Sequence, residues 1–139
     1  MNVSTEVYSF HMTSPIRIIT TPLWPEPRGH YSRAVVHGDS VYVSGILPLE
    51  PQHQSVVSGS LEEQTLRVLA ALSEILRAAG SQMNRVVKLT VYITDIGQWE
   101  TVNRTCAQVF GNHRPARTIV PVTGLHYGCL IEIDAIAAL

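Results

Sequence analysis

Two ionisable residues near the end of the chain have the chemistry to bind and transform a small acid. Arg117 directly follows Pro115 and Ala116, so the backbone that leads into it is restrained. Its planar guanidinium could hold a carboxylate through two parallel hydrogen bonds. Glu132 stands in an otherwise apolar terminal segment, where it could act as a general base or position a water molecule. Alternatively, the two residues could form a simple ion pair, Arg117 could pair with another surface acid, and Glu132 could face solvent.

Four further residues are candidates for the lining of a binding pocket. Tyr31 lies in a predicted loop, where its ring could stack on a ligand or merely cover the core. Ser44 and Gly45 end a predicted strand, and the glycine would let a backbone N–H approach a substrate oxygen, although an ordinary strand exit has the same pattern. Asn103 lies beside the apolar stripe of a predicted helix, where it could equally be solvated. None of these four residues decides a function by itself.

The sequence lacks the common motifs for metals, nucleotides and hydrolase triads. Its 6 histidines are scattered among predicted loops and turns, without the H-E-x-x-H pattern of a zinc site. Cys106 and Cys129 form no C-x-x-C pair. The patterns G-x-G-x-x-G and G-x-S-x-G and the Walker phosphate loop are also missing. We therefore expect neither a metal nor a cofactor.

Length and charge limit the class of protein. The 139 residues fit one domain, predicted over residues 15–139, after a loose extension over residues 1–14 that has no clear periodicity. The net charge of −1 offers no electrostatic footprint for a phosphate backbone, which argues against nucleic-acid partners. No apolar run approaches the ~20 residues of a membrane span, so no membrane partner is expected. The chain starts without the basic end and apolar block of a signal peptide, which predicts a cytoplasmic location.

The hydrophobic pattern predicts the elements that would position these residues. A Ser-x-x-Glu capping box at Ser60, apolar residues at helical spacing and a stop at Gly80 predict a long helix. A second helix that carries Asn103 is predicted to begin near Asp95. The predicted strands cover residues 16–20, 33–37, 41–44, 86–93, 117–122 and 130–138, and a Gly-Asp turn makes the second and third a hairpin.

The resulting order of elements, β-β-β-α-β-α-β-β, predicts an α+β domain. Each helix separates two strands by enough residues for a crossover, so two β-α-β units on one mixed sheet are expected. Pro121 would hold its strand to an edge of the sheet or would end the strand. Both helices would cover one face of the sheet. The other face must also be covered, and a small chain often covers it with another subunit.

In this order along the chain, the segments resemble the YjgF/RidA family of reactive-intermediate deaminases. The resemblance runs from about residue 16 to residue 137. It rests most strongly on Pro-Ala-Arg at residues 115–117, followed at the family's spacing by Glu-Ile-Asp-Ala-Ile-Ala at residues 132–137. Further matching segments lie at residues 29–34, 43–48, 64–65, 75–80, 86–92 and 102–103, with Phe110 between the last of these and the Pro-Ala-Arg motif.

The resemblance implies a chorismate-mutase-like fold and a homotrimer with the sheets inside, the helices outside and active clefts between subunits. It implies that Arg117 grips the carboxylate of a small imino or enamino acid, and that Glu132 positions or activates water. The implied reaction is the hydrolysis of a 2-aminoacrylate-type enamine or imine to a 2-keto acid and ammonia, without cofactor or metal. The positions that line the family's pocket match four candidate residues, Tyr31, Ser44, Gly45 and Asn103.

The chain departs from the family's pattern at five positions, several of them near the expected cleft mouth: His30, Arg33, Ile46, Cys106 and His126. These departures leave Arg117 in place but bring the usual substrate range into question. A family enzyme that acts on a larger biosynthetic intermediate is therefore one alternative. A non-catalytic, ligand-binding or chaperone-like trimer is a second, which the retained arginine disfavours. An endoribonuclease is a third, which the near-neutral charge disfavours.

Overall fold

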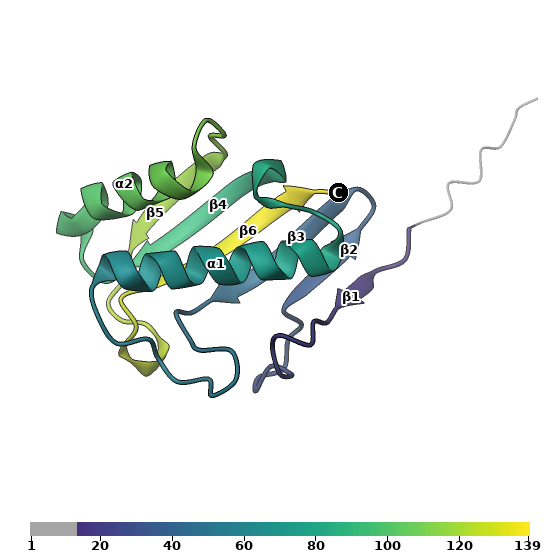
Figure 1. Ribbon diagram of the computed structural model, residues 1–139, viewed down its shortest axis with the longest axis horizontal. Helices are drawn as coiled ribbons and strands as arrows, with labels where there is room; N and C mark the ends of the chain where they lie inside the picture. Colours follow the sequence, from purple (N-terminus) through teal and green to yellow (C-terminus); the bar gives the residue numbers. More distant parts are fainter. Residues whose placement is uncertain (1–13) are drawn as a thin grey trace, which may run out of the picture.

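The computed structural model describes residues 14–139, which form one mixed sheet with two α-helices on one of its faces (Figure 1). The strand order across the sheet is β1-β2-β3-β6-β4-β5. The elements in chain order are β1 (Arg17–Ile19), β2 (Ala34–His37), β3 (Ser40–Ile46), α1 (Leu61–Ala79), β4 (Val86–Ile93), α2 (Trp99–Phe110), β5 (Ala116–Pro121) and β6 (Ile131–Ala138). The predicted α+β fold and its order of elements are confirmed. The predicted extension over residues 1–14 lies, except for its last residue, outside the described residues.

The last strand, β6, lies in the middle of the sheet between β3 and β4 and runs antiparallel to both. β3 and β4 are therefore parallel to each other, and α1 makes the crossover from one to the other. β4 and β5 are parallel neighbours, and α2 connects them. Both predicted β-α-β units are thus present, and both helices lie on the same side of the sheet, as the handedness rule for such crossovers requires.

Helix α1 begins and ends at the predicted signals. The Ser60 hydroxyl accepts from the Glu63 N–H at 3.2 Å, and the Glu63 carboxylate accepts from the Ser60 N–H at 2.9 Å, which completes the capping box. Gly80 ends the helix at a φ of 88°, a left-handed conformation that glycine adopts without steric cost. Neither α1 nor any other helix in the described part of the chain is both long and apolar enough to cross a membrane.

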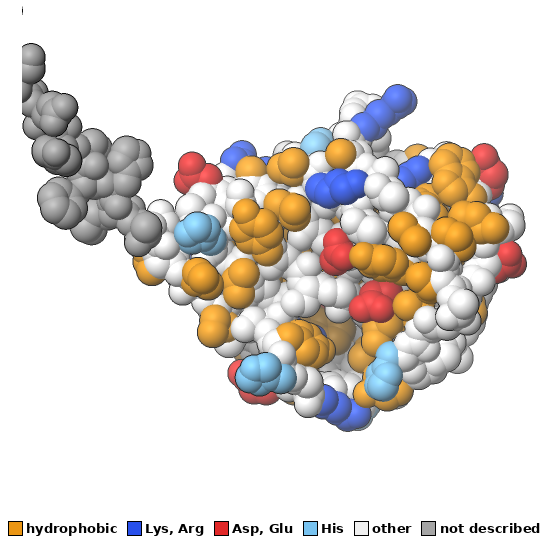
Figure 2. All heavy atoms as spheres, turned by 180° about the vertical axis from the view of Figure 1, so that it is seen from behind, with side chains coloured by type: hydrophobic (Ala, Val, Ile, Leu, Met, Phe, Trp, Pro, Cys, Tyr) orange, Lys and Arg blue, Asp and Glu red, His pale blue; other side chains and the backbone are white. Residues whose placement is uncertain are grey.

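The hydrophobic core lies between the helices and one face of the sheet. Leu89, Val91 and Ile93 of β4 are fully buried in it, together with Leu72 of α1. Because successive side chains of a strand point to opposite faces, the residues between them lie on the face turned away from both helices. Figure 2 shows this open face, with hydrophobic side chains spread over it and acidic side chains near its middle. Tyr42, which lies on the open face, keeps 45% of its surface exposed.

The start of α2 and the end of β5 are both set by local features of the chain. Helix α2 begins at Trp99, later than predicted, because a 3-10 turn over Ile96–Gln98 precedes it. The Asp95 carboxylate caps that turn by accepting from the Gly97 N–H at 2.9 Å. The strand β5 is an edge strand with Pro121 as its last residue, so the missing N–H leaves no bond of the sheet unmade.

Replacing Ser60 by alanine removes the capping hydroxyl and leaves the rest of α1 intact. We expect a loss of about 1 kcal/mol in the free energy of unfolding, as is usual for an N-cap. Urea titration followed by far-UV circular dichroism, at one fixed protein concentration, measures this loss. Ser60→Asp keeps an accepting oxygen and should retain most of the stability. An equal loss in both variants would mean that the side-chain oxygen is not the stabilising group.

Candidate active site

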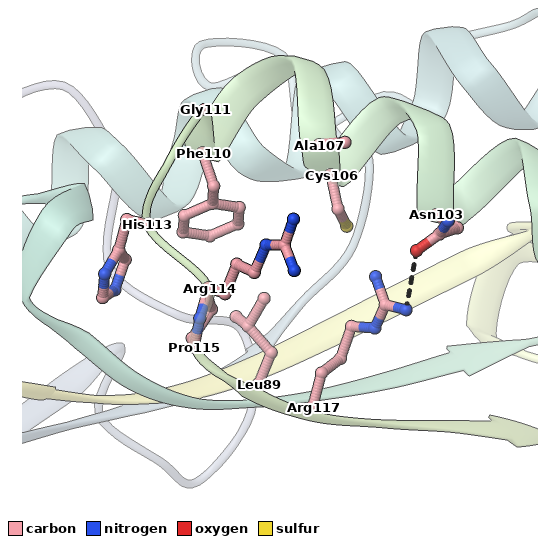
Figure 3. Close-up of a pocket in the computed structure, with 10 residues that line it drawn as sticks. All are labelled: Leu89, Asn103, Cys106, Ala107, Phe110, Gly111, His113, Arg114, Pro115 and Arg117. Carbon is pink, nitrogen blue, oxygen red and sulfur yellow. Dashed lines mark hydrogen bonds between the residues drawn. The ribbon is translucent and has the colours of Figure 1, made fainter.

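A cavity of about 530 Å³ lies between α2 and the segment that leads into β5 (Figure 3). Asn103, Cys106 and Phe110 of α2 line it from above, and Leu89 of β4 lies at its floor. Arg117 projects into it from β5. The cavity therefore brings the predicted carboxylate-binding arginine and the predicted pocket asparagine into one site.

Three contacts determine where the Arg117 guanidinium lies. Arg117 pairs with Leu89 across the parallel ladder, so its side chain points to the helix-covered face of the sheet. Its Nη2 donates to the Asn103 Oδ1 at 3.0 Å, and its Cζ lies 5.5 Å from the centre of the Trp99 ring. The cation–π contact with Trp99 and the hydrogen bond to Asn103 hold the guanidinium in place, while its other N–H donors remain suited to a carboxylate. The alternative of a solvated Asn103 is wrong, because this half-buried side chain holds the arginine.

Glu132 lies beside an irregularity in β3. Between the pairs Val43–Ala135 and Ile46–Ile133, two residues of β3 face one residue of β6. The two are Ser44 and Gly45, which form a β-bulge of the kind that often lies next to active sites. A Cβ on Gly45 would overlap the Glu132 carboxylate, so only glycine permits this close approach. The prediction that Ser44 and Gly45 end the strand is wrong, since the bulge keeps β3 paired to Ile46.

Tyr31 and Ser44 complete the surroundings of Gly45. These three residues line a second, smaller cavity of about 50 Å³. The Ser44 hydroxyl donates to the Ser32 carbonyl oxygen at 2.5 Å, and the Ser44 N–H donates to the Arg33 carbonyl oxygen at 2.9 Å. These bonds hold the bulge to the loop that carries Tyr31. Tyr31 is 54% exposed, so much of its surface is open to contact with a ligand.

The site residues thus form two groups, and the ionisable residue of each group lies on a different face of the sheet. We call Trp99, Asn103 and Arg117 the arginine half-site, and Tyr31, Ser44, Gly45 and Glu132 the glutamate half-site. Glu132 pairs with Tyr92 and Arg117 with Leu89, and these two partners lie three positions apart on β4. An odd separation along one strand puts their neighbours on opposite faces. An ion pair between Arg117 and Glu132 within one chain, one of the alternatives left open by the sequence, is therefore wrong.

The environment of Glu132 changes its proton affinity. Burial raises the pKa of its carboxyl, the negative charge of Asp134 raises it further, and His126 lowers it. Asp134, two positions along on the same face, accepts a hydrogen bond from the Tyr92 hydroxyl at 3.1 Å. A carboxyl with a raised pKa exchanges a proton closer to neutral pH than an ordinary glutamate does.

The five residues that depart from the family pattern differ in which cavity they line. Cys106 lines the arginine cavity, and Ile46 and Arg33 line the smaller cavity with Tyr31. Arg33 also donates two hydrogen bonds to the Pro25 carbonyl oxygen, at 2.7 Å and 3.2 Å, and so restrains the proline-rich loop. His126 shares a further cavity with Tyr31. The exposed residue at position 30 lines none of these three cavities.

Sequence reasoning missed Trp99 and Arg114 as parts of the site. The hydrophobic pattern indicates only a core-facing role for Trp99, yet its ring makes a cation–π contact with the Arg117 guanidinium. Its position four residues before Asn103 was the available signal, because residues at that spacing share one helix face. The sequence pattern assigns no role to Arg114, which directly precedes the Pro-Ala-Arg motif, although its side chain lines the arginine cavity. Among residues 14–139, no cluster of three or more His, Cys, Asp or Glu is arranged to hold a metal ion.

Comparison with known proteins gives these half-sites a context. A family model described as Endoribonuclease L-PSP matches residues 21–139. The chain belongs to the YjgF/RidA family. This YjgF/RidA protein is 39% identical over 121 residues to a human protein, which is named 2-iminobutanoate/2-iminopropanoate deaminase. The match covers 87% of this chain and 88% of the human protein.

Solved structures of relatives share the fold. A putative endoribonuclease from Thermotoga maritima has a TM-score of 0.84 and 42% identity, covering 88% of this chain and 97% of its own. TdcF of E. coli, in a structure with bound serine, has a TM-score of 0.82 and 32% identity, covering 88% and 98%. The resemblance drawn from the motifs is thus confirmed, and so is the fold that it implied for the single chain.

The raised pKa of Glu132 can be measured directly. Carbon-detected NMR titration of the side-chain carboxyl should place its pKa above that of an ordinary glutamate. Asp134→Asn removes a like charge and should lower the pKa of Glu132, whereas His126→Ala removes the imidazole that lowers this pKa and should raise it. Shifts in the same direction in both variants would contradict the charge arrangement described here.

Proposed function

We propose that this protein is a hydrolytic deaminase that converts 2-imino acids and their enamine tautomers, of the 2-aminoacrylate type, to 2-keto acids and ammonia. The observation that carries the proposal is the Arg117 guanidinium, which lines a cavity, is held by Asn103 and makes a cation–π contact with Trp99. Such a group is suited to bidentate binding of a small carboxylate. The name of the human relative states this activity for that protein, and the serine bound in E. coli TdcF is an amino acid of similar size.

The reaction needs only orientation and one proton-transfer group. Arg117 holds the substrate carboxylate, and the enamine tautomerises to the imine. Water adds to the carbon of the C=N bond, while Glu132 takes one of its protons and passes it to the nitrogen. The resulting carbinolamine loses ammonia and leaves the keto acid, so each turnover consumes one water molecule. Modest acceleration suffices, because such imines already hydrolyse readily in water.

We also propose that the active protein is a cytoplasmic homotrimer with its sites in clefts between subunits. Within one chain the two half-sites face away from each other, so a single copy cannot present both to one substrate. The open face of the sheet carries exposed apolar side chains such as Tyr42, and a second copy would cover them. An edge strand, β5, holds Arg117 at the rim of the chain, where a neighbour's glutamate half-site can reach it.

Replacing Arg117 by alanine should abolish most of the activity without unfolding the protein. Loss of a charge-assisted bidentate contact removes roughly 3–5 kcal/mol of transition-state stabilisation, a factor of about 10²–10⁴ in kcat/KM. Arg117→Lys should recover part of this, because an ammonium keeps the charge but not the fork. The assay generates imino acids in situ with an amino-acid oxidase and traps the remaining imine with semicarbazide.

The matched control is Arg104→Ala, which removes an exposed arginine from α2 outside the cavity. It should leave both the rate and the melting temperature near wild type. A folded Arg117→Ala protein with near wild-type activity would refute the carboxylate clamp. A fall in activity that merely follows a fall in melting temperature would assign Arg117 a structural role instead.

Mixing two inactive variants tests whether each site draws on two copies. Arg117→Ala and Glu132→Gln should each be inactive alone, because each lacks one half-site. Random trimers from an equal mixture, refolded together, should regain about one quarter of wild-type activity, since a site forms where an intact arginine meets an intact glutamate. A site within one chain predicts no recovery at all. Light scattering on the same samples measures the oligomeric state, and a monomer would exclude the trimer.

A further inference from the structure

The arginine cavity contains a second guanidinium to which the proposed reaction assigns no task. Arg114 lines the same cavity as Arg117, together with Phe110 and Cys106 of α2 (Figure 3). Arg114 precedes Pro115, so its backbone is restricted to extended conformations. The two guanidinium groups therefore enter the cavity from one short, restrained segment.

The charged side chains that line this cavity are all basic. Its lining includes Arg114, Arg117 and His113 but neither an aspartate nor a glutamate. Arg117 is held by Asn103, whereas within residues 14–139 Arg114 has no hydrogen bond or ion pair to a protein group. Two cations facing one concave space without a counter-ion repel each other and raise the local potential, which an anionic ligand would relieve.

The cavity is also larger than a small imino acid requires. Its volume of about 530 Å³ falls within the range of pockets that take drug-sized molecules. An imino acid of the 2-aminoacrylate type is far smaller and needs only one of the two arginines. A substrate with a longer side chain that ends in an anion would use both the space and the second cation.

We propose that Arg114 is a second anion-binding residue, and that the preferred substrates are 2-imino dicarboxylates. Arg117, fixed by Asn103 and Trp99, takes the carboxylate next to the reacting carbon. Arg114, exposed at the rim of the cavity, takes the carboxylate at the end of the side chain. The substrate class rests on the proposed deaminase function, but the anion site itself can be tested without turnover.

The test compares two keto acids of equal chain length, 2-oxoglutarate and 2-oxopentanoate, which differ in a terminal carboxylate against a methyl group. Titration calorimetry on the full chain should give 2-oxoglutarate an affinity at least about tenfold higher, because a charge-assisted contact is added. Arg114→Gln should abolish that preference while leaving the affinity for 2-oxopentanoate within about twofold. Arg104→Gln, which removes an exposed arginine outside the cavity, should keep the preference.

Turnover supplies a second, separate readout. Imines generated from glutamate and from norvaline should differ in kcat/KM in the same direction, and Arg114→Gln should erase the difference. If the keto acids are discriminated but neither imine is hydrolysed faster than in water, the deaminase proposal fails and the anion site stands.

Three results would overturn the assignment of Arg114. The first is a wild-type protein that binds both keto acids equally. The second is a preference for 2-oxoglutarate that survives in Arg114→Gln. The third is dissociation of the oligomer by Arg114→Gln with an unchanged preference in the remaining assembly, which would mean that Arg114 pairs with a carboxylate of a second copy.

Discussion

Side chains alternate between the two faces of a β-sheet, and here that alternation separates the guanidinium from the carboxylate. Arg117 is paired with Leu89, and Glu132 with Tyr92, three positions along the same strand. The arginine consequently takes its neighbours from α2, and the glutamate takes its neighbours from the bulge in β3. The site that we propose is complete only where two copies meet, so assembly and catalysis depend on the same register of strands.

The two half-sites give their ionisable groups different environments, suited to different tasks. Arg117 makes a cation–π contact with Trp99 and a hydrogen bond to Asn103, which together hold a permanently charged group in place. Glu132 is half-buried beside Asp134, which raises its pKa and makes the carboxyl an easier proton carrier near neutral pH. One group is therefore suited to holding a charge in place and the other to moving a proton. In the proposed reaction, these are the tasks of binding the substrate and activating water.

The names carried by relatives point to two chemistries, and the charge distribution favours one of them. The family description and the Thermotoga maritima structure carry the word endoribonuclease, whereas the human relative is named for imine hydrolysis. RNA binding draws its affinity from cations spread along a backbone. Here the net charge is −1, and Arg114 and Arg117 face one cavity. That concentration of positive charge matches a small, anionic ligand better than it matches a nucleic acid.

Local signals in the chain predict most of the helices and strands, although they place the start of α2 and the end of β3 wrongly. The ends of α1 follow from the Ser60 capping box and Gly80, and β4 follows from alternating apolar residues, because these signals lie within a few residues of one another. The Pro-Ala-Arg motif at residues 115–117 likewise indicates the family, because its residues are adjacent in the chain. No local signal predicts that Arg117 and Glu132 face opposite ways, that β3 bulges at Gly45, or that Arg114 lines the cavity; the folded chain shows all three. These features depend on how strands distant along the chain are paired, and a one-residue change in that register would reverse every side chain of a strand.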